Sequence, residues 1–371
     1  MKHIPHPYQT LYSELAQRSH DGLFASDFDV EGRFITAEVK GRRYWYFDLS
    51  NGEGGKKRTY VGPVEDPEIT KRVEAFKDLK ADIRERRKLV STLVREAHLP
   101  RPERQTGDIV QALAEAGFFR LRGVLIGTVA YLCYPAIVGV RLPGTAMITA
   151  DADFAQFHSS SIAVEDQMPS VIETLRKVDL TFREIPHQAD GLTTQYASRS
   201  GYKVEFLTPN RGSEDYGGRP TPMPALDGAS AQPLRFLDFL IYQPIRAVLL
   251  HGAGVLVNVP APERYAIHKL IVANRRRTDD DGTAKGRKDR AQAATLIEAM
   301  IEQRQTEDLA DAFMEACDRG PAWREAIRKS IDQIEDGLRQ RIRSALINGI
   351  HKLERDPDAY DLTERAADIP T

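Results

Sequence analysis

The longest apolar stretch of the chain, residues 124 to 140, constrains the fold most, because it is interrupted too often to cross a membrane. It contains Gly127, Thr128 and Pro135, and Pro143 follows it closely. A membrane-spanning helix needs about 20 consecutive apolar residues. The pattern predicts instead a buried strand followed by a helix. We therefore expect no transmembrane segment and no membrane partner.

Length and composition predict a multidomain protein of the ordinary globular kind. The chain has 371 residues, of which 41% are hydrophobic and 29% charged, and a chain of this length usually forms two or three domains. The net charge of -2 means that a nucleic-acid surface would have to be a local basic patch. Cys133 and Cys317 form neither a disulfide framework nor a zinc motif. Since residues 1 to 20 lack a signal-peptide pattern, we expect a cytoplasmic protein.

Four regions follow one another along the chain and together predict an α+β protein. Residues 1 to 64 predict a small β-rich module with an aromatic strand at Arg43 to Leu49 and a turn signal at residues 51 to 55. Residues 65 to 105 predict a charged helical connector. Residues 106 to 259 alternate between strand and helix patterns, and residues 260 to 371 predict a helical domain.

The third and fourth regions also allow predictions for single elements. We expect helices over residues 108 to 116, 129 to 138, 170 to 178, 285 to 302 and 322 to 353, strands over residues 121 to 126, 147 to 154, 180 to 185, 193 to 197, 202 to 207 and 248 to 259, and mostly loop over residues 209 to 233.

Three acids lie on two of the predicted strands. Asp151 and Asp153 are two residues apart, so their side chains share one face of a strand. Glu205 interrupts an apolar strand pattern, where an unpaired carboxylate is costly to bury. Carboxylate oxygens are the ligands that Mg²⁺ prefers, and Mg²⁺ commonly serves phosphoryl transfer. The alternative is that the aspartates cap a turn and that Glu205 lies on an exposed strand edge.

The Asp-x-Asp pattern by itself has little specificity. We interpret the other instances as a turn or strand edge and as solvated loop charges; they are Asp27/Asp29, Asp279/Asp281 and Asp356/Asp358.

Gly127 and Thr128 follow the first predicted buried strand at the start of a helix. A small pair at such a junction lets the backbone approach a phosphate, and the helix N-terminus adds positive potential. The alternative interpretation is an ordinary helix N-cap.

These segments together resemble the polymerase-β nucleotidyltransferase superfamily. The matching pieces are LIGT at residues 125 to 128, TADADF at 149 to 154 and KVEFLTP at 203 to 209. The chain looks most like a bacterial branch of nucleotidyltransferase-fold proteins that is related to abortive-infection and type IV toxin nucleotidyltransferases. The likeness spans about residues 110 to 300 and implies a polymerase-β-like core, a mixed sheet with helices.

The resemblance also implies roles for the acids. Asp151 and Asp153 would hold two Mg²⁺ ions, with Mn²⁺ as an alternative, and Glu205 would complete one metal site and orient or deprotonate the attacking hydroxyl. Many superfamily members have Asp where this chain has Glu205, and the gap between Thr128 and Asp151 is longer here than in the polymerases.

Two lysines match positions at which the toxin-type enzymes contact the triphosphate. Lys269 lies in ERYAIHKLIV, and Lys288 precedes Asp289 in GRKDRAQAATLI. The resemblance implies that both lysines bind the nucleotide and that Asp289 orients a base or a lysine. The alternatives are a lysine that extends along an amphipathic helix to solvent and a solvated lysine at a helix start. The basic residues 275 to 277 and 285 to 290 flank a predicted mobile loop and could contact a polynucleotide.

We therefore expect a Mg²⁺-dependent nucleotidyltransferase with an NTP substrate. The expected acceptor is an RNA 3′ end, such as that of tRNA, or a protein side chain, in a toxin–antitoxin or phage-defence system that could include an antitoxin partner. The alternatives are a small-molecule nucleotidyltransferase of the aminoglycoside type and a non-catalytic protein that binds a nucleotide or a partner on the same fold.

Overall fold

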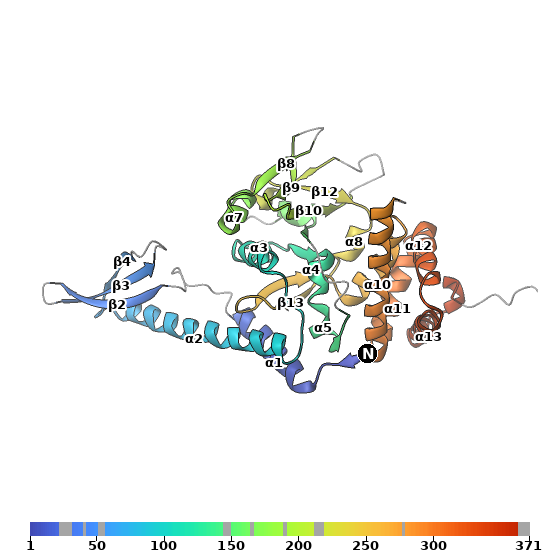
Figure 1. The fold of residues 1–371 in the computed structure, drawn as a ribbon, viewed down its shortest axis with the longest axis horizontal. Coiled ribbons are helices and arrows are strands. Elements are labelled where there is room, and N and C mark those ends of the chain that lie inside the picture. Colours follow the sequence, from blue (N-terminus) through green and yellow to red (C-terminus); the bar gives the residue numbers. More distant parts are fainter. Residues whose placement is uncertain are drawn as a thin grey trace, which may run out of the picture.

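A mixed β-sheet forms the upper part of the main body of the molecule in the view of Figure 1. The structure is a computed structural model that describes residues 1–21, 32–39, 42–50, 56–143, 150–163, 167–187, 191–210, 219–276 and 279–362. It contains both helices and a mixed sheet, as the α+β prediction requires. None of the helices in this described part is long and apolar enough to span a membrane.

The central sheet is built around β10 (Lys203–Pro209). On one side β10 pairs in parallel with β7 (Asp151–Ala155), and β7 pairs antiparallel with β5 (Val124–Ile126). On its other side the first half of β10 pairs with β9 (Thr193–Ala197) and the second half with β12 (Ser230–Leu234). Strands β8 (Arg183–Pro186) and β11 (Thr221–Pro222) extend these two branches.

Aromatic packing fixes which way the two central strands face. Phe154 on β7 stacks on Phe206 on β10 with 5.7 Å between ring centroids, and Phe118 packs edge-on against both rings. These rings are buried in the main hydrophobic core, to which α3 (Arg104–Glu115) and α7 (Val171–Val178) also contribute. Because side chains alternate along a strand, a slip of one residue would turn the rings outward, so the core determines the face on which the neighbouring residues lie.

The helices of the second half of the chain pack beside this sheet (Figure 1). Helix α9 contacts α10, α11 and α12, and α11 contacts α13. The bounds of these helices and of the shorter ones are α4 Gly127–Tyr131, α5 Tyr134–Ile137, α6 His158–Ala163, α8 Leu237–Leu240, α9 Pro262–Ala273, α10 Asp280–Glu302, α11 Thr306–Asp318, α12 Pro321–Asp332 and α13 Asp336–Lys352, with 3-10 turns at Pro224–Leu226 and Pro357–Tyr360.

The N-terminal part projects from the main body. The long helix α2 (Pro67–Arg95) carries a three-stranded antiparallel sheet at its far end, as Figure 1 shows. The strands are β2 (Arg33–Val39), β3 (Arg42–Ser50) and β4 (Lys56–Pro63). At its near end, α2 packs on α1 (His6–Asp21), and β1 (Lys2–His3) pairs with β6 (Val140–Arg141).

The predicted strand over residues 248 to 259 is wrong, since this segment forms most of a hairpin. Strand β13 (Ile245–Leu249) pairs antiparallel with β14 (Val255–Val259) in a separate two-stranded sheet. Gly252 and Gly254 between them have φ values of 56° and 88°, a left-handed conformation that glycine adopts without strain. The continuous apolar pattern led to the prediction of one strand, although the two glycines in the sequence indicated a turn.

Other expected elements also need correction. The helix expected over residues 129 to 138 is two short helices, α4 and α5, and the strand expected from residue 121 starts at Val124 because turns precede it. The helix over residues 322 to 353 is interrupted after Asp332, where the Glu335 carboxylate accepts hydrogen bonds from the amides of Gly337 and Leu338 and starts α13. The expected loop over residues 209 to 233 contains β11 and β12, and α11 was not predicted.

Two of the acids that we interpreted as loop charges are helix caps. Asp279 accepts a hydrogen bond from the amide of Gly282 and begins α10, and Asp356 accepts one from the amide of Asp358. The expected mobile loop over residues 279 to 282 is therefore the first turn of α10. Asp27 and Asp29, the turn signal at residues 51 to 55 and the first part of the strand expected over residues 147 to 154 lie outside the described residues.

Candidate functional site

The three acids lie together on two neighbouring parallel strands. In the register of β7 and β10, Glu205 pairs with Asp153 and Lys203 pairs with Asp151. Ala152 and Phe154 on β7 and Val204 and Phe206 on β10 are buried in the core. The acids alternate with them and so point to the opposite face of the sheet, where Asp151 is exposed and the other two are half-buried. Neighbouring strands lie about 4.8 Å apart, which brings the three carboxylates into one cluster.

The cluster concentrates negative charge. Burial, together with the charges of Asp151 and Glu205, raises the pKa of Asp153 to about 7. Burial also raises the pKa of Glu205, although the Gln195 side chain donates a hydrogen bond of 2.7 Å to Glu205 Oε1 and acts in the opposite sense. The ionised forms of Asp153 and Glu205 are therefore disfavoured until further positive charge comes close.

These residues fit a divalent cation in donor type and in strand position. Carboxylate oxygens suit Mg²⁺ or Mn²⁺, and two acids at alternate positions of one strand with a third across the pair present them from one side. Within the described residues, no three His, Cys, Asp or Glu side chains converge closely enough to form a ready-made metal site. One oxygen of Glu205, Oε1, already accepts a hydrogen bond from Gln195.

Gly127 lies against Asp153. It follows Ile126, which pairs with Asp153 in the register of β5 and β7, and its φ is 65°. A Cβ atom at this position would lie 2.5 Å from Asp153 Oδ2. Residue 127 must therefore be glycine for two reasons, its left-handed backbone and the closeness of the carboxylate.

Thr128 lies in the first turn of α4 and is half-buried. The N-cap of this helix is Ile126, and no side chain caps it. The alternative interpretation of Gly127 and Thr128 as an ordinary N-cap is therefore wrong. The Thr128 hydroxyl makes no hydrogen bond with any residue that the structure describes, which leaves it available to a ligand beside Asp153.

Lys269 is held in the interior by an acid on the next helix. Its side chain is 8% exposed, and Nζ donates to Asp289 Oδ1 over 2.6 Å. Arg276 donates to the other carboxylate oxygen of Asp289 over 2.9 Å. The alternative interpretation of Lys269 as a lysine extended to solvent is wrong, because its ammonium group is buried in this pair. Asp289 orients a lysine here, as the resemblance implied.

The two cations that share Asp289, namely Lys269 and Arg276, lie near the acid cluster. Both cations lie near enough to Asp153 to act against the rise in its pKa. Lys269 also lies over the Tyr265 ring, and the Tyr265 hydroxyl lies 3.1 Å from the carbonyl oxygen of Gly127. Helix α9 thus connects the cations to the strand-to-helix junction at Gly127.

Lys288 reaches the same cluster from α10. It is half-buried, and burial, together with the charge of Lys269, lowers its pKa, while Asp151 and Asp153 act in the opposite sense. Lys288 therefore lies within electrostatic range of both aspartates. The structure brings all seven residues predicted for the site to one region: the three acids, Gly127, Thr128, Lys269 and Lys288.

Sequence reasoning missed two members of this region as individual residues. Gln195 lies opposite Glu205 in the antiparallel register of β9 and β10, and Arg276 shares Asp289 with Lys269. The run of three arginines at residues 275 to 277 was visible, but it does not show which arginine turns inward. For Gln195, only the pairing of the two strands gives a signal.

A family model described as Nucleotidyltransferase matches residues 104–318, more than half of the chain. The match includes β5, β7 and β10 as well as α9 and α10, which together provide the site. The comparisons with curated proteins and with solved structures found no match. The family match, on a chain whose acids and lysines meet as described, shows that this protein belongs to the nucleotidyltransferase family and is a nucleotidyltransferase enzyme.

Proposed function

We propose that the protein transfers a nucleoside monophosphate from an NTP to a hydroxyl acceptor and releases pyrophosphate, with Mg²⁺ or Mn²⁺, on a polymerase-β-like core. One observation supports this most: Glu205 lies across from Asp153 in parallel register, with Asp151 on the same face. Carboxylates at these positions suit the two cations that phosphoryl transfer commonly uses. The cations of Lys269 and Lys288 lie beside them and match a triphosphate in charge.

Each residue of the site has a role in this proposal. Asp151 and Asp153 would hold both ions, and Glu205 would share one of them and accept the proton of the attacking hydroxyl. When bound, the ions neutralise phosphate charge and align the attacking and leaving oxygens. The acceptor oxygen forms a bond to the α-phosphorus, and the bond between this phosphorus and the bridging oxygen of pyrophosphate breaks.

The remaining residues would bind the triphosphate. Gly127 lies beside Asp153, and the hydroxyl of the next residue, Thr128, makes no hydrogen bond with a described residue, so a phosphate oxygen could approach backbone and hydroxyl donors there. Lys269 and Lys288 would neutralise the charge that develops on pyrophosphate. The acceptor in this proposal is an RNA 3′ end, such as that of tRNA, or a protein side chain, in a toxin–antitoxin or phage-defence setting.

The test uses α-labelled NTPs with total RNA, with lysate protein and with an aminoglycoside, each with Mg²⁺ and with EDTA. We expect Mg²⁺-dependent label in RNA or protein, and a loss of at least about 100-fold in Asp151→Asn and in Glu205→Gln. Glu184→Gln is the matched control, since Glu184 is an exposed acid on β8 of the same sheet. Label in the aminoglycoside alone supports the small-molecule enzyme. NTP binding without any transfer supports the non-catalytic alternative, and full activity in Asp151→Asn with Asp153→Asn contradicts the proposal.

A further inference from the structure

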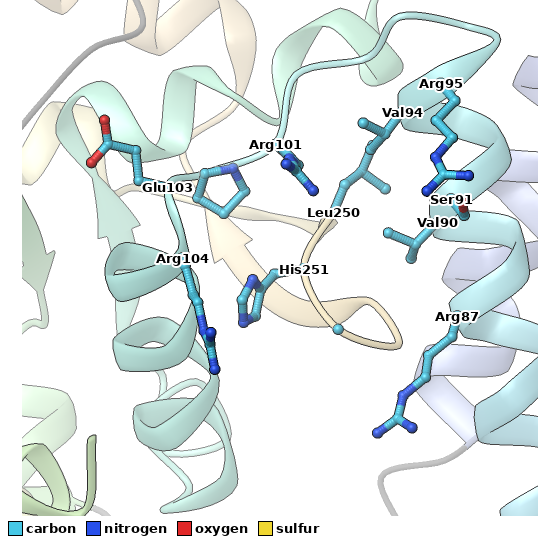
Figure 2. A pocket seen from close by; sticks show the side chains of 12 residues that line it. Arg87, Val90, Ser91, Val94, Arg95, Arg101, Glu103, Arg104, Leu250 and His251 are labelled. Atoms are coloured by element: carbon cyan, nitrogen blue, oxygen red, sulfur yellow. The ribbon is translucent and has the colours of Figure 1, made fainter. Parts of the chain in front are cut away.

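A groove of about 810 Å³ lies outside the acid cluster, between the near end of α2 and the start of α3. Arg87 and Arg95 reach into it from α2, and Arg101 and Arg104 come from the other side, with His251 between them (Figure 2). The walls between the arginines are partly apolar, from the side chains of Val90, Val94, Pro102 and Leu250. A groove of this kind presents cations around an apolar lining.

Part of the positive charge of the groove has no acidic partner among the described residues. Neither Arg95 nor Arg101 makes an ion pair or side-chain hydrogen bond with any described residue, and both are exposed. Arg104 is 94% exposed and lies 3.6 Å from Asp108. Asp108 also lies 2.8 Å from Nε2 of His251. The carboxylate of Glu103, the only acid that lines the groove among the described residues, points away from it in Figure 2.

This concentration of arginine is local, because the chain as a whole has a net charge of -2. Arg87 and Arg95 are eight residues apart on α2, which places their Cα atoms about 12 Å apart along the helix. That length corresponds to three or four nucleotides of a strand, at about 3.4 Å for each nucleotide. Arginine, more than lysine, pairs with phosphate in a two-pronged geometry.

A hydrogen bond between α3 and the residue before β10 links one wall of the groove to the strand that carries Glu205. The Tyr202 hydroxyl donates a hydrogen bond of 2.9 Å to Thr106 Oγ1 in the first turn of α3. Tyr202 directly precedes Lys203, which pairs with Asp151, and the charges of Asp151, Asp153 and Glu103 all act on this tyrosine. The side chain of Tyr202 therefore connects the start of α3, next to Arg101 and Arg104, with the first residue of β10.

We propose that this groove binds the sugar-phosphate backbone of a nucleic-acid acceptor and directs its 3′ end to the acid cluster. The inference rests on the proposed function for the chemistry at the 3′ end, but binding in the groove does not require turnover. The arginines contact phosphates, and the apolar walls contact ribose and base faces. The apolar walls favour a nucleic acid over an acidic protein segment, whose carboxylates would need the arginines alone.

Binding of fluorescein-labelled single-stranded RNA of mixed sequence, followed by polarisation in EDTA, tests the groove without catalysis. We expect Arg95→Glu with Arg101→Glu to weaken binding about tenfold or more and to lower the slope of log affinity against log salt by about 1.4, since each lost contact with single-stranded phosphate removes about 0.7. The matched control is Arg328→Glu with Arg355→Glu, two exposed arginines in the C-terminal part of the chain with the same change in charge. The milder pair Arg95→Gln with Arg101→Gln is measured in case the reversed charges disturb folding.

Three results would overturn the groove assignment. They are no RNA binding by the unaltered protein, equal loss in the control pair, and competition by polyglutamate that matches competition by unlabelled RNA. The last result would assign the groove to an acidic protein instead. If the groove variants lose RNA binding while no variant or substrate shows nucleotidyl transfer, the groove assignment stands and the proposed function fails. A raised KM for RNA with unchanged NTP affinity supports both.

Discussion

A Cβ atom on Gly127 would lie 2.5 Å from Asp153 Oδ2, with the backbone of Gly127 at a φ of 65°. Gly127, at the junction of β5 and α4, and the carboxylate of Asp153 are therefore in direct contact. Whatever side chain replaces the glycine must move the carboxylate or the backbone.

Gly127→Ala is expected to lower activity about 100-fold, the scale of loss when a reacting group is misplaced by about 1 Å. It should also destabilise the fold by about 1–2 kcal/mol, because alanine in the left-handed region is strained. Gly228→Ala is the control, since Gly228 has a φ of 79° and nothing within 4 Å of the added atom. It should show the strain in urea unfolding without the loss of activity, and equal losses of activity would contradict the account.

The acid cluster should make stability depend on pH and on Mg²⁺. The pKa of Asp153 is about 7 in the fold against 3.8 as a reference, so the folded state binds the proton more tightly than the unfolded state. Stability should therefore fall as the pH rises from about 4 to about 7 and stay level above it, by on the order of 1–3 kcal/mol from this group.

Asp153→Asn should flatten that decline, and Mg²⁺ should raise Tm more at pH 8 than at pH 5, because the cation competes with the proton. Thermal unfolding across the pH range, with Mg²⁺ and with EDTA, checks both. An equal Mg²⁺ effect at the two pH values would be inconsistent with binding at the acids.

The buried pair of Lys269 and Asp289 should respond to the loss of one partner much more than to the loss of both. Asp289→Leu leaves a buried ammonium without its carboxylate and is expected to cost on the order of 3–5 kcal/mol. Lys269→Met with Asp289→Leu should recover much of that stability but bind NTP weakly. Urea unfolding and NTP titration measure the two effects.

The control for this pair is Lys329→Ala on α12, where Lys329 and Glu325 are 54% and 56% exposed. An exposed pair of this kind contributes little, so no measurable change in stability is expected. A double variant that binds NTP normally would show that Lys269 has only a structural role.

Gln195 should tune the pH dependence of catalysis. Its hydrogen bond to Glu205 acts to lower the pKa of that acid, so Gln195→Leu should raise it. Activity that requires ionised Glu205 should then appear at higher pH, and the acidic limb of the kcat profile should move upward. Gln232→Leu on β12 should leave the limb in place, and a shift of equal size in that control would assign the effect to the sheet in general.

Local patterns were sufficient to predict two strands of the central sheet, β9 and β10, and to draw attention to the three acids. Alternation predicted β9 at its observed bounds, and β10 within two residues, because neighbouring side chains decide which face of a strand is buried. The position of Glu205 among Val204, Phe206 and Leu207 was likewise readable from the sequence. The chemistry assigned to the acids and lysines came from a resemblance, and the family match supports nucleotidyl transfer without testing these residues.

Contacts between distant segments could not be predicted in this way. Strand β12 forms because Gln232 and its neighbours pair with the second half of β10. The sequence of residues 209 to 233 does not indicate this pairing. The same holds for Gln195 beside Glu205 and for Arg276 beside Asp289, which meet through pairing and packing. The break between α12 and α13 could not be predicted either, because the apolar periodicity continues across it, while Glu335 caps the start of α13.

The hairpin of β13 and β14 has a consequence for the cooperativity of unfolding. Ala247 and Leu249 belong to the main core, whereas Val248 and Leu250 belong to a second cluster with α1 and α2. The Tyr12 hydroxyl donates to the Val248 carbonyl and accepts from its amide, at 3.2 and 2.9 Å. The strand β13 therefore contributes side chains to both hydrophobic clusters. Loss of the α1 contacts would also weaken the main core, which contains the strands of the acid cluster. We expect the two clusters to unfold in a single transition.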